Sequence, residues 1–406
     1  MEFRTVAKKV MVVDEFPEEI VENIVVRLPV KSIWRFRCVC KDWYKLLKGN
    51  SRFVRLHLKH AVELNRFKFM LYSLHPSKKN IYTITYDPST FSVSSRKRVI
   101  TSRKNLIDVK YPFKSENTTG VGFWGSCDGL VCLSPGYLAR MKQSLLDVVM
   151  IWNPSTGEYR KLPPAPIVGK PDYLEYGFGY DQKIDDFKVV CLAGNDDKFW
   201  CRTCVYTLGG SNSWGPMKKI PYNLACQELA GRLQEVPDMG RLPVNGVIHW
   251  IAFRKSGQVV SKVILSSNFE KQEFAEIQLP NPLDERFHTN LCVLEGSLCL
   301  LHMSKLRVDL WELSNYEEEN SWTMLFTIDA EKVFGYVGYL IPLRCFKNGK
   351  SLLAFDRDGA FNIGLYDSER QTFKPFMVFG GMISYSVCTI SMLKAYIRLA
   401  KILHTN

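Results

Sequence analysis

A turn followed by an apolar strand recurs along most of this chain and restricts it to a fold made of repeated β-units. Three copies have their turn glycines at Gly246, Gly296 and Gly349, at intervals of about 50 residues. A fourth copy, Asp128-Gly129, lies about two such intervals before the first of them. Asp-Gly and Asn-Gly pairs favour tight hairpin turns because both residues tolerate positive φ. The interval predicts units of four strands, like the blades of a β-propeller.

Two further strands follow the turn strand in each copy. The first ends in an aromatic or aliphatic residue before a turn, at 150–154, 263–266, 310–313 and 364–367. The second runs from polar to apolar residues, at 158–162, 271–279, 321–328 and 371–376. The remaining room holds one unit around 176–220 and an earlier one over 67–98. We therefore predict a six-bladed, kelch-like β-propeller closed by a late strand at 383–393, because closure removes an exposed sheet edge.

The best-known propeller signatures are missing from the sequence. Kelch repeats carry a glycine pair in each blade, whereas Gly209-Gly210 and Gly380-Gly381 are isolated, and no Trp-Asp repeat occurs. The alternatives to a propeller are a pair of β-sandwiches and an irregular β-domain.

A helical pattern precedes the β-units. Pro17 and two glutamates open a segment whose apolar residues recur at helical spacing from Ile20 to Leu28, and Pro29 restarts the chain. Shorter apolar stripes follow within 33–60, so we predict three or four short helices. A module of this size is marginally stable alone, and its surplus of apolar residues indicates a partner surface. The alternative is a helical cap on the β-domain.

The helical segment resembles the F-box of plant F-box proteins. The resemblance is carried by Pro17-Glu18-Glu19-Ile20, by Leu28-Pro29-Val30-Lys31-Ser32 and by Arg37-Cys38-Val39-Cys40-Lys41-Asp42-Trp43. It implies docking on a Skp-type linker, which joins the chain to a cullin–RING ubiquitin ligase. The linker-binding residues that it implies are Phe16, Pro17, Ile20, Ile24, Leu28, Pro29, Val39, Cys40 and Trp43. Phe16 stands where leucine is usual, and Trp34 stands where a smaller aliphatic residue is common.

The β-domain carries a second resemblance. The stretches 124–132, 151–163, 176–181 and 185–190 resemble the F-box-associated domain of plant F-box proteins, a broad group that includes the S-locus F-box proteins of self-incompatibility. In that family the domain is implied to capture the protein that is ubiquitinated. The expected fold class is thus α+β and multidomain, with an F-box at 14–60, a propeller-like substrate-binding domain at 66–393 and a tail at 394–406.

Charge and cysteine usage limit the partners. The net charge is +13, but the basic residues are scattered, and the densest run, 94–104, is typical of a solvated loop or strand edge. We therefore expect no nucleic-acid partner. We also expect no membrane contact, because the uncharged stretch 375–393 alternates like a strand. Most cysteines sit in apolar runs, as free thiols do in a reducing compartment. Cys201 and Cys204 lack further ligands nearby, so neither a metal nor a cofactor is expected.

No catalytic motif is recognisable. His249 lies in an alternating strand and is expected to be packed, and Asp185-Asp186 is expected to form a hairpin turn rather than an acid–base pair. The sequence therefore indicates a non-catalytic substrate receptor of a ubiquitin ligase in the cytoplasm, the nucleus or both, with an unknown protein substrate. Two alternatives stay open. One is a glycan-binding or enzymatic propeller with exposed tryptophans at 124, 200 and 214, and the other is an F-box scaffold outside ubiquitination.

Overall fold

The computed structural model describes most of the chain, with gaps. The described residues are 17–28, 30–36, 38–41, 43–44, 53, 56–57, 60, 67–73, 81–86, 107–112, 121–135, 148–154, 157–195, 197–224, 243–244, 246–281, 283, 288–294, 296–304, 307–316, 318, 321–335, 339–346, 349–357, 360–379 and 385–390.

Two short helices open the described chain, α1 (Glu18–Val26) and α2 (Val30–Phe36). Pro17 stands at the N-cap of α1, where its carbonyl accepts the amide of Ile20 at 2.9 Å, and Arg27 forms the C-cap. The helices enclose a small core that includes Val25, Ile33 and Phe53. The third and fourth helices expected from the sequence lie largely outside the described residues.

The rest of the described chain forms six antiparallel sheets. The first contains β23 (Tyr385–Ile390), β1 (Phe67–Ser73), β2 (Ile81–Tyr86) and β3 (Ile107–Val109). The second contains β4 (Val121–Cys127), β5 (Leu130–Pro135), β6 (Met150–Trp152) and β7 (Tyr159–Lys161). The third contains β8 (Tyr173–Asp181), β9 (Asp186–Gly194), β10 (Cys201–Thr207) and β11 (Lys218–Ile220).

The remaining three sheets follow in chain order. The fourth contains β12 (Val247–Ser256), β13 (Val259–Asn268) and β14 (Glu273–Ile277). The fifth contains β15 (His288–Leu294), β16 (Ser297–Met303), β17 (Arg307–Leu313) and β18 (Trp322–Asp329). A short helix, α6 (Ala330–Phe334), leads to the sixth, β19 (Tyr339–Cys345), β20 (Lys350–Arg357), β21 (Ala360–Asp367) and β22 (Thr372–Phe379).

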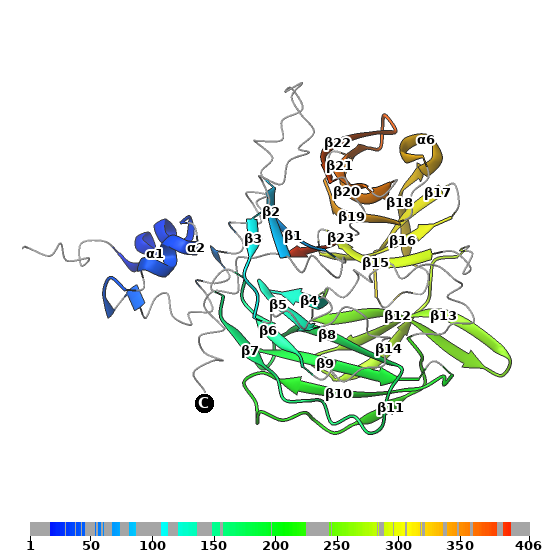
Figure 1. Ribbon diagram of the computed structural model, residues 1–406, viewed down its shortest axis with the longest axis horizontal. Coiled ribbons are helices and arrows are strands. Elements are labelled where there is room, and N and C mark those ends of the chain that lie inside the picture. Colours follow the sequence, from blue (N-terminus) through cyan, green and yellow to red (C-terminus); the bar gives the residue numbers. More distant parts are fainter. Residues whose placement is uncertain are drawn as a thin grey trace, which may run out of the picture.

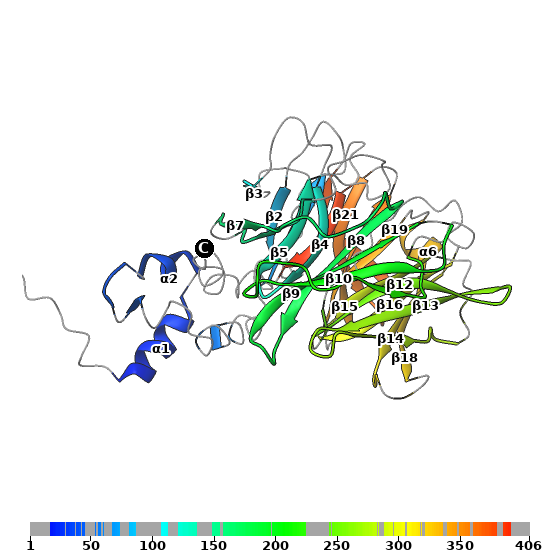
Figure 2. The same ribbon diagram turned by 90° about the horizontal axis from the view of Figure 1, so that it is seen from below.

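The sheets follow one another around a ring. The first described strand of one sheet contacts that of the next, from β23 to β4, β8, β12, β15 and β19. Figures 1 and 2 show the order from cyan through green and yellow to orange. Apolar clusters between adjacent sheets form the core; one of them joins Trp124 of β4 to Tyr176 and Phe178 of β8. The predicted β-propeller with few helices is confirmed.

The last described strand completes the first sheet. β23 pairs antiparallel with β1, in a register that runs from Lys68↔Ile390 to Ser73↔Tyr385. The predicted closing strand is therefore confirmed, and the uncharged stretch contributes strands rather than a helix. Of the unit expected at 67–98, β1 and β2 lie inside that range, whereas β3 and β23 lie beyond it.

One sheet departs from the expected set of four-stranded units. Five of the six sheets have four strands, but the sheet of β12 to β14 has three among the described residues. In three other sheets the turn glycine separates the first and second strands, whereas Gly246 precedes β12. A backbone bridge between Val244 and Val247 spans that turn with two hydrogen bonds of 2.8 Å. β12 therefore corresponds to the second strand of its neighbours.

The propeller has two unlike faces. On one face, tight turns join the first strand to the second, such as Asp128-Gly129 with φ of 52° and 80° and the β8–β9 turn with Asp185 at 55°. On the opposite face lie the β9–β10 connection at 195–200, the β7–β8 connection at 162–172 and the β12–β13 hairpin. Contacts tie these three connections together: Asp172 pairs with Gly194, and Lys255 lies over Phe199. We call this the long-loop face.

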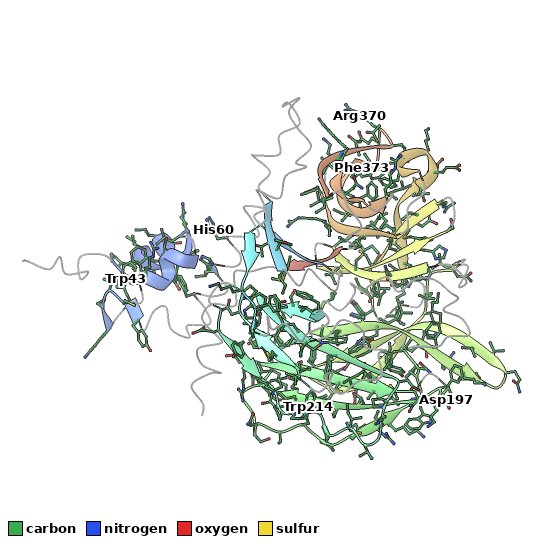
Figure 3. All side chains as sticks on the ribbon, in the orientation of Figure 1. Trp43, His60, Asp197, Trp214, Arg370 and Phe373 are labelled. Carbon is green, nitrogen blue, oxygen red and sulfur yellow. The ribbon has the colours of Figure 1, made fainter. Side chains whose placement is uncertain are left out.

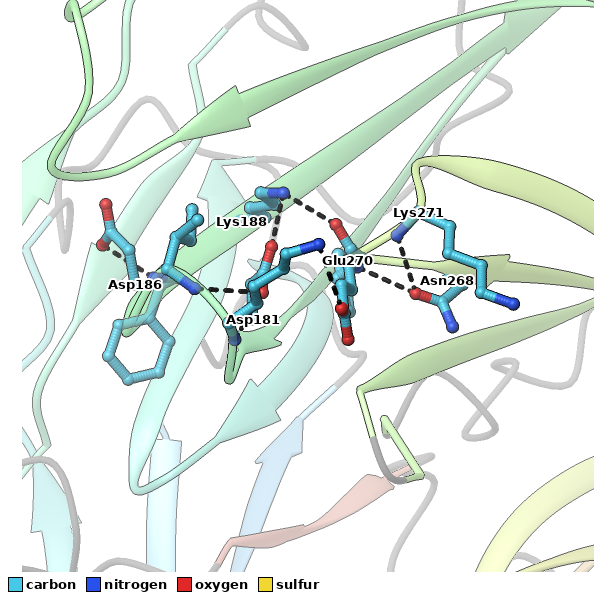
Figure 4. A network of polar contacts seen from close by, with 10 residues as sticks. Asp181, Asp186, Lys188, Asn268, Glu270 and Lys271 are labelled. Atoms are coloured by element: carbon cyan, nitrogen blue, oxygen red, sulfur yellow. Dashed lines mark hydrogen bonds and ion pairs between the residues drawn. The ribbon is translucent and has the colours of Figure 1, made fainter.

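A buried ion pair fastens the third sheet to the fourth at the tight-turn face (Figure 4). The Lys188 ammonium lies 2.6 Å from the Asp181 carboxylate and donates to the Phe269 carbonyl at 2.7 Å. The side chains of Lys188 and Asp181 are 4% and 1% exposed. The Phe269 ring packs over Gly179, where an added Cβ would lie 2.1 Å from a ring carbon, so only glycine fits there.

Candidate functional site

The helical module divides its apolar residues between a core and an exposed surface. Val25 and Ile33 are buried, whereas Ile20 and Ile24 on α1 are 46% and 56% exposed and Val39 is 61% exposed. Ile20 and Ile24 are four residues apart and therefore lie on one side of the helix. The sequence pattern predicted one apolar stripe along this helix. In the structure, some residues of the stripe are buried in the core and others are exposed.

The other implied linker-binding residues occupy three kinds of position. Pro17 and Cys40 are exposed, while Leu28 and Trp43 are partly buried against the core of the module. The Trp43 ring lies 5.2 Å from the Phe36 ring, and Figure 3 shows Trp43 among the helices. Phe16 and Pro29 lie outside the described residues.

His57 contributes to the module in a way that sequence reasoning missed. Its Nε2 lies 3.0 Å from the carbonyl oxygen of Leu28, which follows the C-terminal end of α1. Burial lowers the pKa of His57. A histidine on the apolar side of an expected helix was the available signal, because such a ring needs a hydrogen-bond partner when buried.

The candidate catalytic and metal-binding residues of the β-domain have structural roles. Asp185-Asp186 forms part of the β8–β9 turn, as expected, and Asp186 accepts the amides of Phe187 at 2.7 Å and Gly209 at 2.6 Å. Cys201 and Cys204 belong to cores on opposite faces of their sheet, so they do not share a ligand. The described part of the chain holds no group of three or more His, Cys, Asp or Glu side chains placed to bind a metal ion.

His249 is buried completely in β12, and neither ring nitrogen has a hydrogen-bond partner among the described residues. Burial lowers its pKa to about 3, and its ring lies 5.6 Å from that of Tyr316. The expectation of a packed histidine is confirmed. Such a ring is neutral in the folded protein, which removes it as a proton donor near neutral pH.

The pH dependence of stability is expected to follow from His249. Its folded-state pKa lies below the unfolded value of 6.5, so the stability present above pH 6.5 is lost as the pH falls. By pH 5 the loss amounts to about 2 kcal/mol. Thermal unfolding of the wild type and of His249→Phe, each at pH 7.5 and pH 5, checks this. The variant should show a smaller drop between the two pH values, and an equal drop would contradict the assignment.

Of the tryptophans considered for sugar stacking, Trp124 is buried and the other two are partly buried, which corrects the expectation that they are exposed. Trp124 is buried and donates to the Ser134 hydroxyl at 2.8 Å. Trp214 packs on Tyr206 and donates to the Pro163 carbonyl at 2.8 Å. Figure 3 shows Trp214 and Asp197 at separate places in the lower part of the β-domain. Trp200 and Trp214 are both partly exposed, but Trp200 lies among cations rather than against another aromatic ring.

Comparison with known proteins agrees with this division into a helical module and a ring of sheets. The model of the F-box associated beta propeller domain matches residues 79–397, and the model of the F-box domain matches residues 13–55. The chain belongs to the plant F-box proteins with an F-box-associated propeller. Sequence resemblance had indicated this family from the same two regions.

Curated relatives of this F-box protein span most of its length. It is 28% identical to the F-box protein CPR1 of Arabidopsis thaliana over 356 residues, which cover 83% of this chain and 78% of the relative. It is 29% identical to an F-box/kelch-repeat protein of the same plant over 323 residues, which cover 77% and 79% of the two chains. Among its described residues, no helix is both long enough and apolar enough to span a membrane.

Proposed function

We propose that this F-box protein is the substrate-recognition subunit of an SCF-type ubiquitin ligase. The observation that carries the proposal is the exposure of Ile20 and Ile24 on one side of α1, inside the region matched by the F-box model. Exposed apolar residues on so small a module favour a protein partner. The partner is a Skp-type linker, through which the cullin and RING subunits are reached. The docking surface comprises Phe16, Pro17, Ile20, Ile24, Leu28, Pro29, Val39, Cys40 and Trp43.

The receptor acts by proximity and has no catalytic role of its own. It binds a target protein through the propeller and so raises the effective concentration of the target's lysines near the charged conjugating enzyme. The assembly works in the cytoplasm, the nucleus or both. Its parts are an F-box at 14–60, a substrate domain at 66–393 and a tail at 394–406, and the six sheets are six blades of one ring.

Replacement of Ile24 tests the docking surface. Ile24→Asp is expected to weaken co-purification with a Skp-type linker by about 100-fold or more, because docking would bury a carboxylate without a partner. The helix should persist, since the side chain is exposed. Ile184→Asp is the matched control, because Ile184 is 50% exposed in a propeller turn. Circular dichroism verifies folding, and linker capture by Ile24→Asp at the wild-type level would contradict the proposal.

The partly buried Trp43 is less suitable for this test. Trp43→Asp removes ring packing on Phe36 and destabilises the module, so loss of linker binding would not identify a contact. Cullin co-purification separates the two remaining roles: wild type that captures the linker without a cullin is a scaffold outside ubiquitination. The glycan-binding alternative has lost support, because Trp124 is buried and Trp214 is packed on Tyr206 with its ring N–H donated to the Pro163 carbonyl.

A further inference from the structure

Three cations surround one tryptophan on the long-loop face. The Lys219 Nζ lies 4.0 Å from the centre of the Trp200 ring, the Arg202 Cζ lies 5.3 Å away and the Lys198 Nζ lies 5.6 Å away. The neighbouring Phe199 ring carries the Lys255 ammonium at 5.0 Å. We call this surface the Trp200 patch, formed by Lys198, Phe199, Trp200, Arg202, Lys219 and Lys255.

The positive charge of the patch is not neutralised within the described part of the chain. Lys198, Lys219 and Lys255 form no ion pair with a described residue, and Arg202 donates to the Val168 carbonyl at 3.0 Å. The nearest carboxylates in sequence are those of Asp196, which lies outside the described residues, and Asp197, which is exposed and also forms no ion pair with a described residue. Among the described residues, the patch therefore carries an excess of positive charge.

This arrangement lowers the stability of the sheet that carries it. Arg202 and Lys219 stand directly opposite each other in the β10–β11 ladder, and like charges in that position are destabilising. Lysines on an outermost strand such as β11 also prevent pairing between sheet edges. Protection of the sheet edge explains Lys219. It does not explain the two partly exposed aromatic rings or the position of Lys255 on another sheet. A ligand that supplies negative charge accounts for all of them.

The connection that carries the patch is held from beneath by a buried amide. Asn223 is fully buried, and its Nδ2 donates to the carbonyls of Asn195 at 3.1 Å and Lys198 at 2.6 Å. Its backbone pairs with Phe253 of β12 through hydrogen bonds of 2.9 and 2.7 Å. The patch thus spans the third and fourth sheets on a rigid support. A rigid support lowers the entropic cost of ordering the site on binding.

We propose that the Trp200 patch binds an acidic, aspartate- and glutamate-rich segment of the substrate protein; this rests on the proposed receptor function. Four cations spread over two rings match several carboxylates along an extended chain better than one compact phosphate. Single-stranded nucleic acid would stack bases on aromatic faces. The Lys219 ammonium lies over the Trp200 ring, so a base would have to displace it.

Fluorescence anisotropy with a labelled oligoglutamate peptide tests the proposal on the full chain bound to its linker. Lys219→Glu and Trp200→Ala are each expected to weaken peptide binding by about ten-fold or more. Lys161→Glu makes the same charge reversal at an exposed lysine on the outermost strand β7 and should change affinity less than about two-fold. Asp197→Asn should strengthen binding, because it removes a competing carboxylate. Salt should weaken wild-type binding.

The outcomes separate this inference from the receptor function. Wild type that holds the linker but does not bind oligoglutamate overturns the inference alone, whereas failure to bind any linker overturns the receptor function. Equal losses in Lys161→Glu and Lys219→Glu would show attraction by overall charge and overturn the patch. Tighter binding of single-stranded DNA than of the peptide would also overturn it. Circular dichroism spectra that match the wild type verify that each variant is folded.

Discussion

A chain that ends at Phe379, and so lacks β23, is expected to lose the cooperative unfolding of its β-domain. The six residue pairs between β23 and β1 disappear, and each lost backbone hydrogen bond removes about 0.5–1.5 kcal/mol. The loss also leaves an unpaired edge along β1, and an open strand edge promotes association between chains. The expected result is a domain destabilised by several kcal/mol that aggregates on heating.

A chain that ends at Ile390 is the matched control, because it keeps all of β23. Denaturant unfolding and light scattering compare both chains with the full-length protein. The shorter chain should show a lower midpoint and larger particles, and the control should resemble the full-length protein. A shorter chain that unfolds at the full-length midpoint would show that β23 does not hold the ring closed.

Lys188→Met is expected to destabilise the β-domain by about 3–5 kcal/mol, the usual cost of removing one partner from a buried ion pair. Methionine matches the length of the lysine stem, but Asp181 is left as a buried carboxylate without its cation. The Phe269 carbonyl also loses its donor from Lys188. Denaturant unfolding measures the change.

Two further variants sharpen the measurement. Lys183→Met breaks the neighbouring pair with Glu270, whose side chains are 69% and 51% exposed, and should cost less than about 1 kcal/mol. Asp181→Asn in the Lys188→Met background removes the stranded charge and should recover part of the loss, since the amide still accepts the Lys183 backbone N–H. Equal losses in Lys183→Met and Lys188→Met would contradict a special role for the buried pair.

The repeated sheets could be predicted from sequence because each unit contains a short sequence pattern of its own. A turn glycine such as Gly296 and an alternating strand lie within a few residues of each other, and local patterns are what sequence reasoning reads well. The three-stranded fourth sheet was missed because its glycine, Gly246, looks like the others and differs only in which strands it joins.

Features that join distant segments were beyond local patterns. Lys188 and Phe269 belong to different sheets, so their contact depends on how the sheets are placed around the ring. The same holds for the Trp200 patch, in which Lys255 approaches Phe199 from another sheet. The sequence did not distinguish Trp124, Trp200 and Trp214, and only the fold shows that Trp124 is buried, that Trp214 is packed on Tyr206 and that Trp200 is partly exposed beside three cations. The residues of the α1 surface were predicted together. Which of them face outward depends on how the helix packs against its neighbours.

Because Lys68 pairs with Ile390, the ring can be completed only after residues 68 to 390 have all left the ribosome. Synthesis from residue 60 to residue 390 takes roughly tens of seconds at about 5–20 residues per second. During that interval α1 and α2 are already outside, whereas β1 waits for its neighbour. Under the proposed function, the helical module is thus available to a linker before the propeller that would bind the substrate has closed. If the proposed function holds, a transcript cut short upstream of β23 would yield a product that binds the linker but lacks a closed propeller, and such a product would compete with intact receptors.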